Sequence, residues 1–257
     1  MDSISFDRAA EFYDATRGFP EGVANRVAIS LLSALSPGAS LLEIGVGTGR
    51  IAIPLSVNLA DVTGVDISPR MLARLRFNLP DGIHGPDLVL GDGVKLPFPG
   101  GTFDAVYIVH VIHLIPKWQL ALTEARRSLK PGGVFILGYE SRQPDSPLAR
   151  LRMAFREFSG IDNNSNPVDF TSVQAELERT GAQMDRWVAA SWVKKFRVRK
   201  HIQDLEEGIY SSTWRISPDS LPGVIDRLRG WAVQEFGSLD RDYEIPREFI
   251  WERYRWW

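Results

Sequence analysis

The sequence predicts an α/β protein built on a mostly parallel sheet with helices on both faces. Over the first 140 residues, apolar stretches of strand length alternate five times with stretches of helical spacing, which is typical of strands joined by helical crossovers. Residues 41–50 read LLEIGVGTGR, the form of a strand that ends in a glycine-rich turn and leads into a helix. The chain of 257 residues is long enough for one large domain of this class with an elaborated cap.

Composition narrows the function before any motif is considered. The formal net charge of −2 provides no global basic field, so we do not expect DNA or RNA as a substrate. The absence of cysteine removes disulfides, thiolate ligands and cysteine nucleophiles, and with four histidines we expect no metal site. The acidic, polar start is unlike a secretory signal, and the longest apolar run, residues 105–115, is short for a membrane span. We therefore expect a cytoplasmic protein with no membrane association.

The expected elements of the first half follow the order that a parallel sheet requires. Residues 6–16 and 21–35 have apolar side chains at helical spacing and precede the first strand, residues 40–45. After the second strand, Ser68 is expected as the N-cap of a helix whose first residue is Pro69. The other strands are expected at residues 62–66, 88–90, 102–109 and 134–139, with a helix at 116–129 that ends at the turn of residues 130–133.

Beyond residue 140 the alternation changes. A polar, proline-bearing link at residues 141–147 precedes expected helices at 148–158, 172–180, 199–207 and 218–236 and expected strands at 183–193 and 243–254. We expect the helical insertion before the last strand, about residues 197–238, to form a cap over the active-site mouth. Its prominent side chains either line a substrate pocket or, more commonly for such residues, pack inside the cap; they are Tyr210, Trp214, Arg215 and Trp231.

The glycine-rich turn and the strand after it predict a nucleoside-type ligand. Gly45, Gly47 and Gly49 allow positive φ and a close approach of a ligand to the main chain. Glu43, at the end of the first strand, suits a cation or a hydroxyl better than a pyrophosphate. Asp66 follows the turn by about 20 residues, where a carboxylate can accept both hydroxyls of a ribose.

Five motifs, in this order and spacing, resemble those of the class I S-adenosylmethionine-dependent methyltransferases: Glu43-x-Gly45-x-Gly47-x-Gly49, Asp66, GDG at residues 91–93, FDAV at 103–106 and KPGG at 130–133. The small-molecule branch, of methyltransferase type 11, is the most similar. The resemblance covers roughly the first 140 residues. It implies a Rossmann-like, seven-stranded, mostly parallel sheet with an antiparallel last strand, S-adenosylmethionine as cofactor and S-adenosylhomocysteine as product.

The resemblance also implies a division of the chain and a set of cofactor contacts. Residues 1–140 would hold the N-terminal helices and the cofactor-binding half, and residues 141–257 the rest of the sheet with the cap. The acid at position 92 would pair with the exocyclic amine of adenine. The implied cofactor-binding residues are Tyr13, Glu43, Gly45, Gly47, Gly49, Asp66, Ile67, Met71, Gly91, Asp92, Gly93 and Val109.

The expected reaction is the in-line transfer of a methyl group to an oxygen or carbon of a small molecule. His110 and His113 follow the fourth strand, where acceptors lie in such folds, and residues at i and i+3 share a helical face. Either histidine is a candidate base, although His113 could instead pack structurally. Some relatives that methylate amines carry a proline-rich acidic signature here, which residues 109–112 lack, so nitrogen is the less favoured acceptor.

Two other functions stay open at this point. A module that binds the cofactor without transferring its methyl group would have the same motifs. A nicotinamide-dependent oxidoreductase also uses a glycine-rich turn and a downstream acid, but its third glycine falls three residues after the second, and here the interval is two. Trp251, Trp256 and Trp257 fit either a homodimer contact or packing of the last strand.

Overall fold

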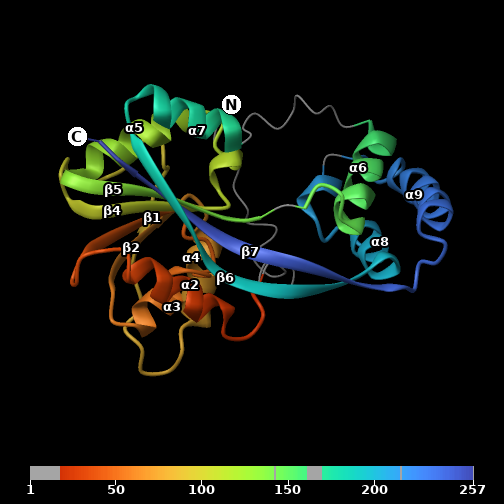
Figure 1. Ribbon diagram of the computed structural model, residues 1–257, viewed down its shortest axis with the longest axis horizontal. Helices are drawn as coiled ribbons and strands as arrows, with labels where there is room; N and C mark the ends of the chain where they lie inside the picture. The colour runs from red at the N-terminus through yellow and green to blue at the C-terminus, as the bar shows by residue number, and fades with distance from the viewer. Residues whose placement is uncertain (1–17, 142, 161–169, 215, 257) are drawn as a thin grey trace. The chain divides into compact units, whose positions relative to one another are not determined.

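The computed structural model describes residues 18–141, 143–160, 170–214 and 216–256. Its sheet has seven strands in the order β3-β2-β1-β4-β5-β7-β6 (Figure 1). The pairs from β3 to β5 are parallel, and β7 runs antiparallel to β5. The predicted fold class is therefore confirmed. The strands are β1 (Ser40–Ile44), β2 (Asp61–Asp66), β3 (Asp87–Leu90), β4 (Phe103–Val109), β5 (Leu129–Glu140), β6 (Gln183–Arg197) and β7 (Asp242–Arg255).

Helices cover both faces of this sheet. In Figure 1, α2, α3 and α4 lie on one face, and α5 and α7 lie on the other. On the second face, Trp118 and Leu122 of α5 share an apolar cluster with Val173 and Leu177 of α7. The helices are α2 (Val23–Leu32), α3 (Ala52–Val57), α4 (Pro69–Asn78), α5 (Trp118–Ser128), α6 (Pro147–Ser159), α7 (Phe170–Arg179), α8 (Val198–Glu206) and α9 (Leu221–Phe236), with the short 3-10 helices η2 (Ile112–Leu114) and η4 (Ser211–Thr213).

Two local predictions had different outcomes. Ser68 caps α4 as expected, because its hydroxyl accepts a hydrogen bond from the Met71 backbone nitrogen at 3.1 Å. Residues 130–133, in contrast, do not form a turn between helix and strand but lie within β5. The pairing with β4 shifts register between Phe103 and Ala105, so this glycine-containing segment is an irregularity of the strand.

The chain divides into two compact units. The first, the sheet unit, comprises Met1–Glu140, Asn166–Ser191 and Glu248–Trp257, and the second, the helical unit, comprises Ser141–Ser165 and Trp192–Arg247. The helical unit contains α6, α8 and α9 around its own apolar core. The helix α6 therefore belongs with the helical insertion expected at about residues 197–238. The assignment of residues 1–140 to cofactor binding and of residues 141–257 to the rest of the sheet with the cap stays a prediction.

The tryptophans near the C-terminus pack within the sheet unit. Trp251 is fully buried, and its indole nitrogen donates to the Val27 carbonyl oxygen at 3.2 Å. The indole nitrogen of Trp256 donates to the Thr180 hydroxyl at 2.9 Å. These contacts account for both side chains without a second subunit, and the homodimer stays a prediction. Trp257, Tyr13 and the helix expected at residues 6–16 lie outside the described residues.

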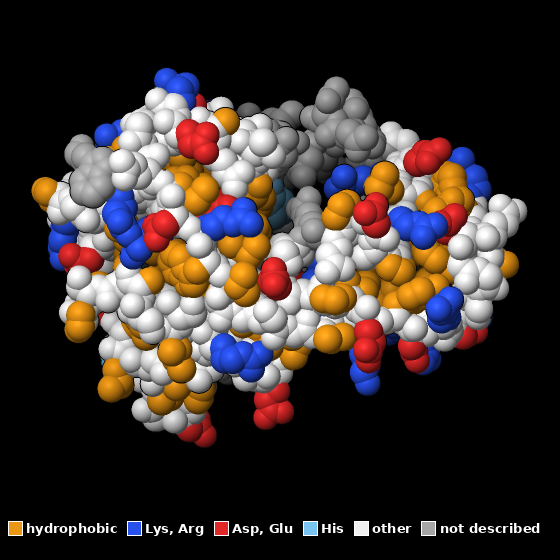
Figure 2. Space-filling model, viewed as in Figure 1, with side chains coloured by type: hydrophobic (Ala, Val, Ile, Leu, Met, Phe, Trp, Pro, Cys, Tyr) orange, Lys and Arg blue, Asp and Glu red, His pale blue; other side chains and the backbone are white. Residues whose placement is uncertain are grey.

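The surface carries no dominant charge on the face seen in Figure 2, where acidic and basic side chains are interspersed. This mixture agrees with the formal net charge of −2. None of the helices in the described ranges is long and apolar enough to cross a bilayer.

Candidate active site

The glycine-rich turn follows β1, and its three glycines differ in what surrounds them. All three have left-handed backbone, with φ of 75°, 55° and 85° at Gly45, Gly47 and Gly49. A Cβ on Gly45 would lie 2.6 Å from Val111, and one on Gly49 would lie 2.7 Å from neighbouring side chains. A Cβ on Gly47 would meet no described atom nearer than a carbonyl oxygen at 4.0 Å. Gly45 and Gly49 are therefore required by packing, whereas Gly47 borders space that a ligand can occupy.

Asp66, the last residue of β2, organises this turn. One carboxylate oxygen accepts from the Gly47 backbone nitrogen at 2.8 Å, and the other accepts from the Ser68 backbone nitrogen at 2.8 Å. Its carbonyl oxygen accepts from the Gly91 nitrogen at 3.0 Å, which ties in the end of β3. Each carboxylate oxygen has two lone pairs, so Asp66 can order the turn and still accept ribose hydroxyls.

Glu43 lies inside the protein, beneath the turn. Its side chain is 3% exposed and accepts a hydrogen bond at 2.9 Å from the Tyr107 hydroxyl, on the neighbouring β4. Burial raises the pKa of Glu43 to about 8, against the lowering effect of the Tyr107 hydrogen bond. Burial and the adjacent Glu43 also raise the pKa of the Tyr107 hydroxyl. The Glu43 carboxyl is therefore mostly protonated at neutral pH, and its contact with the cofactor stays a prediction.

The expected adenine-side residues form a tight turn after β3. The Asp92 carboxylate accepts from the Val94 nitrogen at 3.1 Å, and its carbonyl oxygen accepts from the Lys95 nitrogen at 3.0 Å. A Cβ on Gly93 would lie 2.7 Å from Ile44, so this glycine allows the turn to pack on β1. Of the other implied contacts, Met71 and Val109 are buried and Ile67 is half-buried. Their contacts with the cofactor stay predictions.

The two candidate bases do not share a helical face, so the spacing argument from the sequence is wrong. His110 directly follows β4 and has a left-handed φ of 54°. The helix η2 begins only at Ile112, so His113 lies in it and His110 does not. Because the left-handed residue breaks the helical geometry, i and i+3 spacing no longer places both rings on one side. His110 Nε2 lies 3.8 Å from an oxygen of Glu140.

Arg50 and Glu140 belong to the same strand ends, and the sequence analysis did not identify them. Arg50 directly follows the third glycine, and its Nη2 lies 2.5 Å from Glu140 Oε1, at the end of β5. Their positions along the chain indicated this, since residues that follow the carboxyl ends of parallel strands in one sheet lie along the same edge. Asp104, from the FDAV motif, lies at the opposite end of β4. There Lys130 and Ser40 bind its carboxylate and lower its pKa to about 2.

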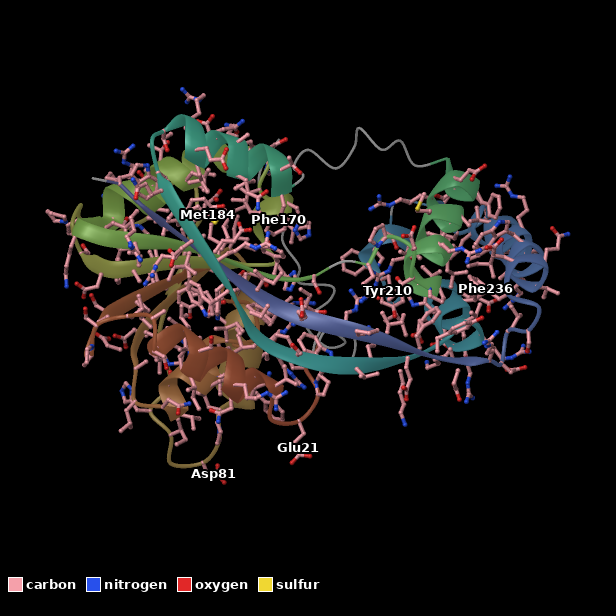
Figure 3. All side chains as sticks on the ribbon, viewed as in Figure 1. Glu21, Asp81, Phe170, Met184, Tyr210 and Phe236 are labelled. Carbon is pink, nitrogen blue, oxygen red and sulfur yellow. The ribbon has the colours of Figure 1, made fainter. Side chains whose placement is uncertain are left out.

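The aromatic side chains for which the sequence left pocket lining and packing as alternatives pack inside the helical unit. Tyr210, labelled in Figure 3 with Phe236, has its ring centroid 4.7 Å from that of His201. Trp231 lies edge-on to Phe236 at 5.6 Å, and the Trp214 indole nitrogen donates to the Gly208 carbonyl oxygen at 2.9 Å. These contacts support the packing interpretation. Arg215 lies outside the described residues.

The geometry of the turn fits S-adenosylmethionine. Gly47 leaves room beside the main chain, and Asp66 presents a carboxylate next to it. Asp92 lies in the turn after β3, the next strand along the same edge. Within the described ranges, no group of three or more acidic, histidine or cysteine residues is arranged to hold a metal ion.

Comparisons with known proteins agree with this geometry. Residues 42–137 match the model of a family described as a methyltransferase domain. A malonyl-acyl-carrier-protein O-methyltransferase from Herminiimonas arsenicoxydans is 34% identical over 201 residues, which are 72% of this chain and 70% of that relative. A fatty-acid O-methyltransferase from Mycolicibacterium smegmatis is 30% identical over 220 residues, 82% of this chain and 64% of that relative.

Other matches are covered only in part by this chain or share only its fold. The chain spans 64% of a second malonyl-acyl-carrier-protein O-methyltransferase, from Methylococcus capsulatus, and 43% of a bifunctional biotin biosynthesis protein from Cellvibrio japonicus. A solved structure described as a putative methyltransferase from Bacillus halodurans has a TM-score of 0.60 at 20% identity and covers 92% of this chain and 99% of its own. That likeness shows the fold alone. Together with the 34% identical relative, the motifs show that this chain belongs to the class I S-adenosylmethionine-dependent methyltransferases.

Proposed function

We propose that this methyltransferase moves a methyl group to an oxygen or carbon of a small-molecule acceptor, with oxygen preferred. The observation that carries the proposal is the placement of His110 beside the glycine-rich turn. Val111, the next residue, packs directly on Gly45, so the end of β4 lies against the end of β1. A titratable residue thus directly precedes the residue that packs on the turn.

When bound, S-adenosylmethionine would supply an electrophilic methyl group, because the positively charged sulfur takes the electron pair of the S–CH3 bond. The protein has three tasks: to hold the nucleoside, to orient an acceptor and to remove its proton. The turn and Asp66 serve the first task. His110, with a side chain 26% exposed, is placed to accept a proton from the acceptor. Orientation in line with the breaking bond supplies most of the acceleration in such reactions.

The preference for oxygen has two supports. The sequence lacks the proline-rich acidic signature that some amine-directed relatives carry at residues 109–112. Two of the relatives, each at least 30% identical, are O-methyltransferases by name, one for malonyl-acyl-carrier protein and one for fatty acid. A fatty acid and a phenol of similar size are therefore suitable first acceptors.

Two measurements test the proposal. The first is calorimetric titration with S-adenosylmethionine, S-adenosylhomocysteine and NAD, for which we expect micromolar binding of the first two ligands and none of the third. The second is transfer of a labelled methyl group to decanoic acid, 4-methylphenol and decylamine. Transfer mainly to the amine would contradict the oxygen preference. Cofactor binding without transfer to any acceptor would favour the alternative of a silent binding module.

A further inference from the structure

A carboxylate and a histidine face one another at the carboxyl ends of β4 and β5. Glu140 Oε1 lies 3.8 Å from His110 Nε2 and 2.5 Å from Arg50 Nη2. The side chains of Arg50, His110 and Glu140 are 14%, 26% and 27% exposed, so water screens these charges only in part. His110 follows the end of β4, Glu140 is the last residue of β5, and Arg50 lies in the turn after β1, all in the sheet unit.

Aromatic rings restrict the movement of this cluster. The Arg50 guanidinium lies 3.6 Å from the centroid of the Phe19 ring. The Phe249 ring packs edge-on against His110 with centroids 6.3 Å apart, and Phe19 packs edge-on against Phe249 at 5.6 Å. The charged groups of the cluster are Glu140 on β5 and Arg50 after β1, and β7 contributes an apolar ring. The imidazole is thus enclosed on two sides by fixed partners.

The backbone of His110 provides an independent observation. Its φ of 54° is left-handed, a conformation that residues other than glycine seldom adopt. Such conformations concentrate at functional sites, where the surrounding structure holds them. Here the left-handed residue turns the chain away from β4 before η2 begins.

We propose that Glu140, itself held by Arg50, is a positioning residue that orients the His110 imidazole as the base for a protic methyl acceptor. This inference rests on the methyl transfer proposed above. The contact of 3.8 Å is longer than a hydrogen bond, but the negative charge of the carboxylate still favours a proton on Nε2, which leaves the lone pair on Nδ1. Arg50 binds the Glu140 carboxylate and fixes its direction.

The proton transfer then has a defined direction. The O–H bond of the acceptor breaks, its proton moves to Nδ1, and its electron pair stays on the acceptor oxygen. The negative charge of Glu140 stabilises the resulting imidazolium, which afterwards releases the proton to water. An acceptor with an ordinary pKa near 10, such as a phenol, needs this step, whereas a carboxylic acid ionised at about pH 4 does not.

Nitrogen-15 NMR of the imidazoles tests the arrangement without turnover. Wild type, Glu140→Gln and Arg50→Gln would be titrated with S-adenosylhomocysteine bound, and a His110→Gln spectrum would assign the resonance. We expect the Nε2–H tautomer in wild type, a fall in the His110 pKa of about one unit in Glu140→Gln and a rise in Arg50→Gln. Opposite shifts from the two variants distinguish electrostatics from a general loss of structure.

Two control variants sharpen this measurement. Glu140→Asp keeps the charge and is expected to retain the wild-type pKa more closely than Glu140→Gln does. Asp61 is exposed at the start of β2, at the end of that strand away from Asp66. Asp61→Asn is expected to change neither the tautomer nor the pKa of His110. An Nδ1–H tautomer in wild type, or a His110 pKa that is equal in wild type and Glu140→Gln, would overturn the proposal.

Kinetics separate this inference from the proposed function. With 4-methylphenol, Glu140→Gln should lower kcat by about 10- to 100-fold, shift the acid limb of the kcat profile with the NMR pKa, and leave cofactor affinity unchanged. With decanoic acid the loss should be much smaller. If no acceptor reacts, the proposed function fails while the NMR result still decides the role of Glu140. Turnover of the phenol that is unaffected by Glu140→Gln would overturn that role.

Discussion

Asp66, at the end of β2, and the surface arginines of the helical unit use their charges in opposite ways. At the strand ends, Asp66 binds backbone nitrogens of the turns beside it. In the helical unit, Arg197 pairs with Asp242 and Arg199 with Asp240 at the surface, and each pair satisfies itself. We therefore expect recognition of the cofactor to depend on main-chain geometry, which few residue types can provide. The helical unit depends on packing, which many sequences can provide.

Gly47→Val is expected to have the largest effect on cofactor affinity of the variants that test this contrast. A side chain at Gly47 enters the space beside the turn, where we expect the cofactor, and affinity for S-adenosylmethionine should fall more than about 100-fold, or roughly 3 kcal/mol. Calorimetry measures the affinity, and far-ultraviolet circular dichroism checks the fold.

Gly82→Val is the matched control for that change. Gly82 also has a left-handed φ, of 75°, and a Cβ there would meet no described atom within 4 Å. It therefore carries a similar backbone strain away from the turn. Wild-type cofactor affinity in Gly47→Val would place the cofactor elsewhere. An equal loss in Gly82→Val would attribute the effect to backbone strain and not to blocked space.

Asp66→Ala is expected to have the next largest effect. Removal of the carboxylate leaves ribose hydroxyls unpaired and releases the Gly47 nitrogen, so cofactor binding should weaken by about 1–3 kcal/mol. Calorimetry with S-adenosylhomocysteine measures the loss. Asp104→Ala removes a carboxylate from the opposite end of β4 and should leave the affinity unchanged. Equal affinities of wild type and Asp66→Ala would refute the ribose assignment.

Glu43→Gln tests whether burial beneath the turn raises the pKa of the Glu43 carboxyl. Its pKa is raised from 4.5 to about 8 by burial, so its contribution to stability is complete below pH 4.5 and is lost as the pH rises through 8. Between pH 6 and pH 9, wild type should lose about 2 kcal/mol of unfolding free energy relative to Glu43→Gln, which does not titrate. Urea denaturation at both pH values measures the difference. A difference that is independent of pH would show that Glu43 is ionised throughout.

The same contrast explains what the sequence could predict. The alternation of strands and helices, the cap of α4 and the edge that bears the turn follow from periodicity and from residues with few alternatives, such as Ser68 and Gly47. The seven-stranded sheet was implied by the family resemblance. The Arg50–Glu140 pair joins residues 90 positions apart, which periodicity cannot bring together. The left-handed His110 is also invisible to spacing rules, because those rules assume that the helix continues. The residues of α6 join the helical unit through long-range contacts, mainly apolar packing, which spacing along the chain does not indicate.

The smallest expected effect comes from the surface pairs of the helical unit. Arg199→Ala removes a bidentate contact with Asp240, but both groups are exposed, and water replaces the lost hydrogen bonds. We expect no measurable change in the thermal midpoint or in cofactor affinity, whereas Ile225→Ala, a core substitution in the same unit, should lower the midpoint clearly. Differential scanning calorimetry compares the two variants. A large loss of thermal stability in Arg199→Ala would mean that ion pairs stabilise the helical unit. Charged side chains would then be structurally important in both places, and the contrast drawn above would fail.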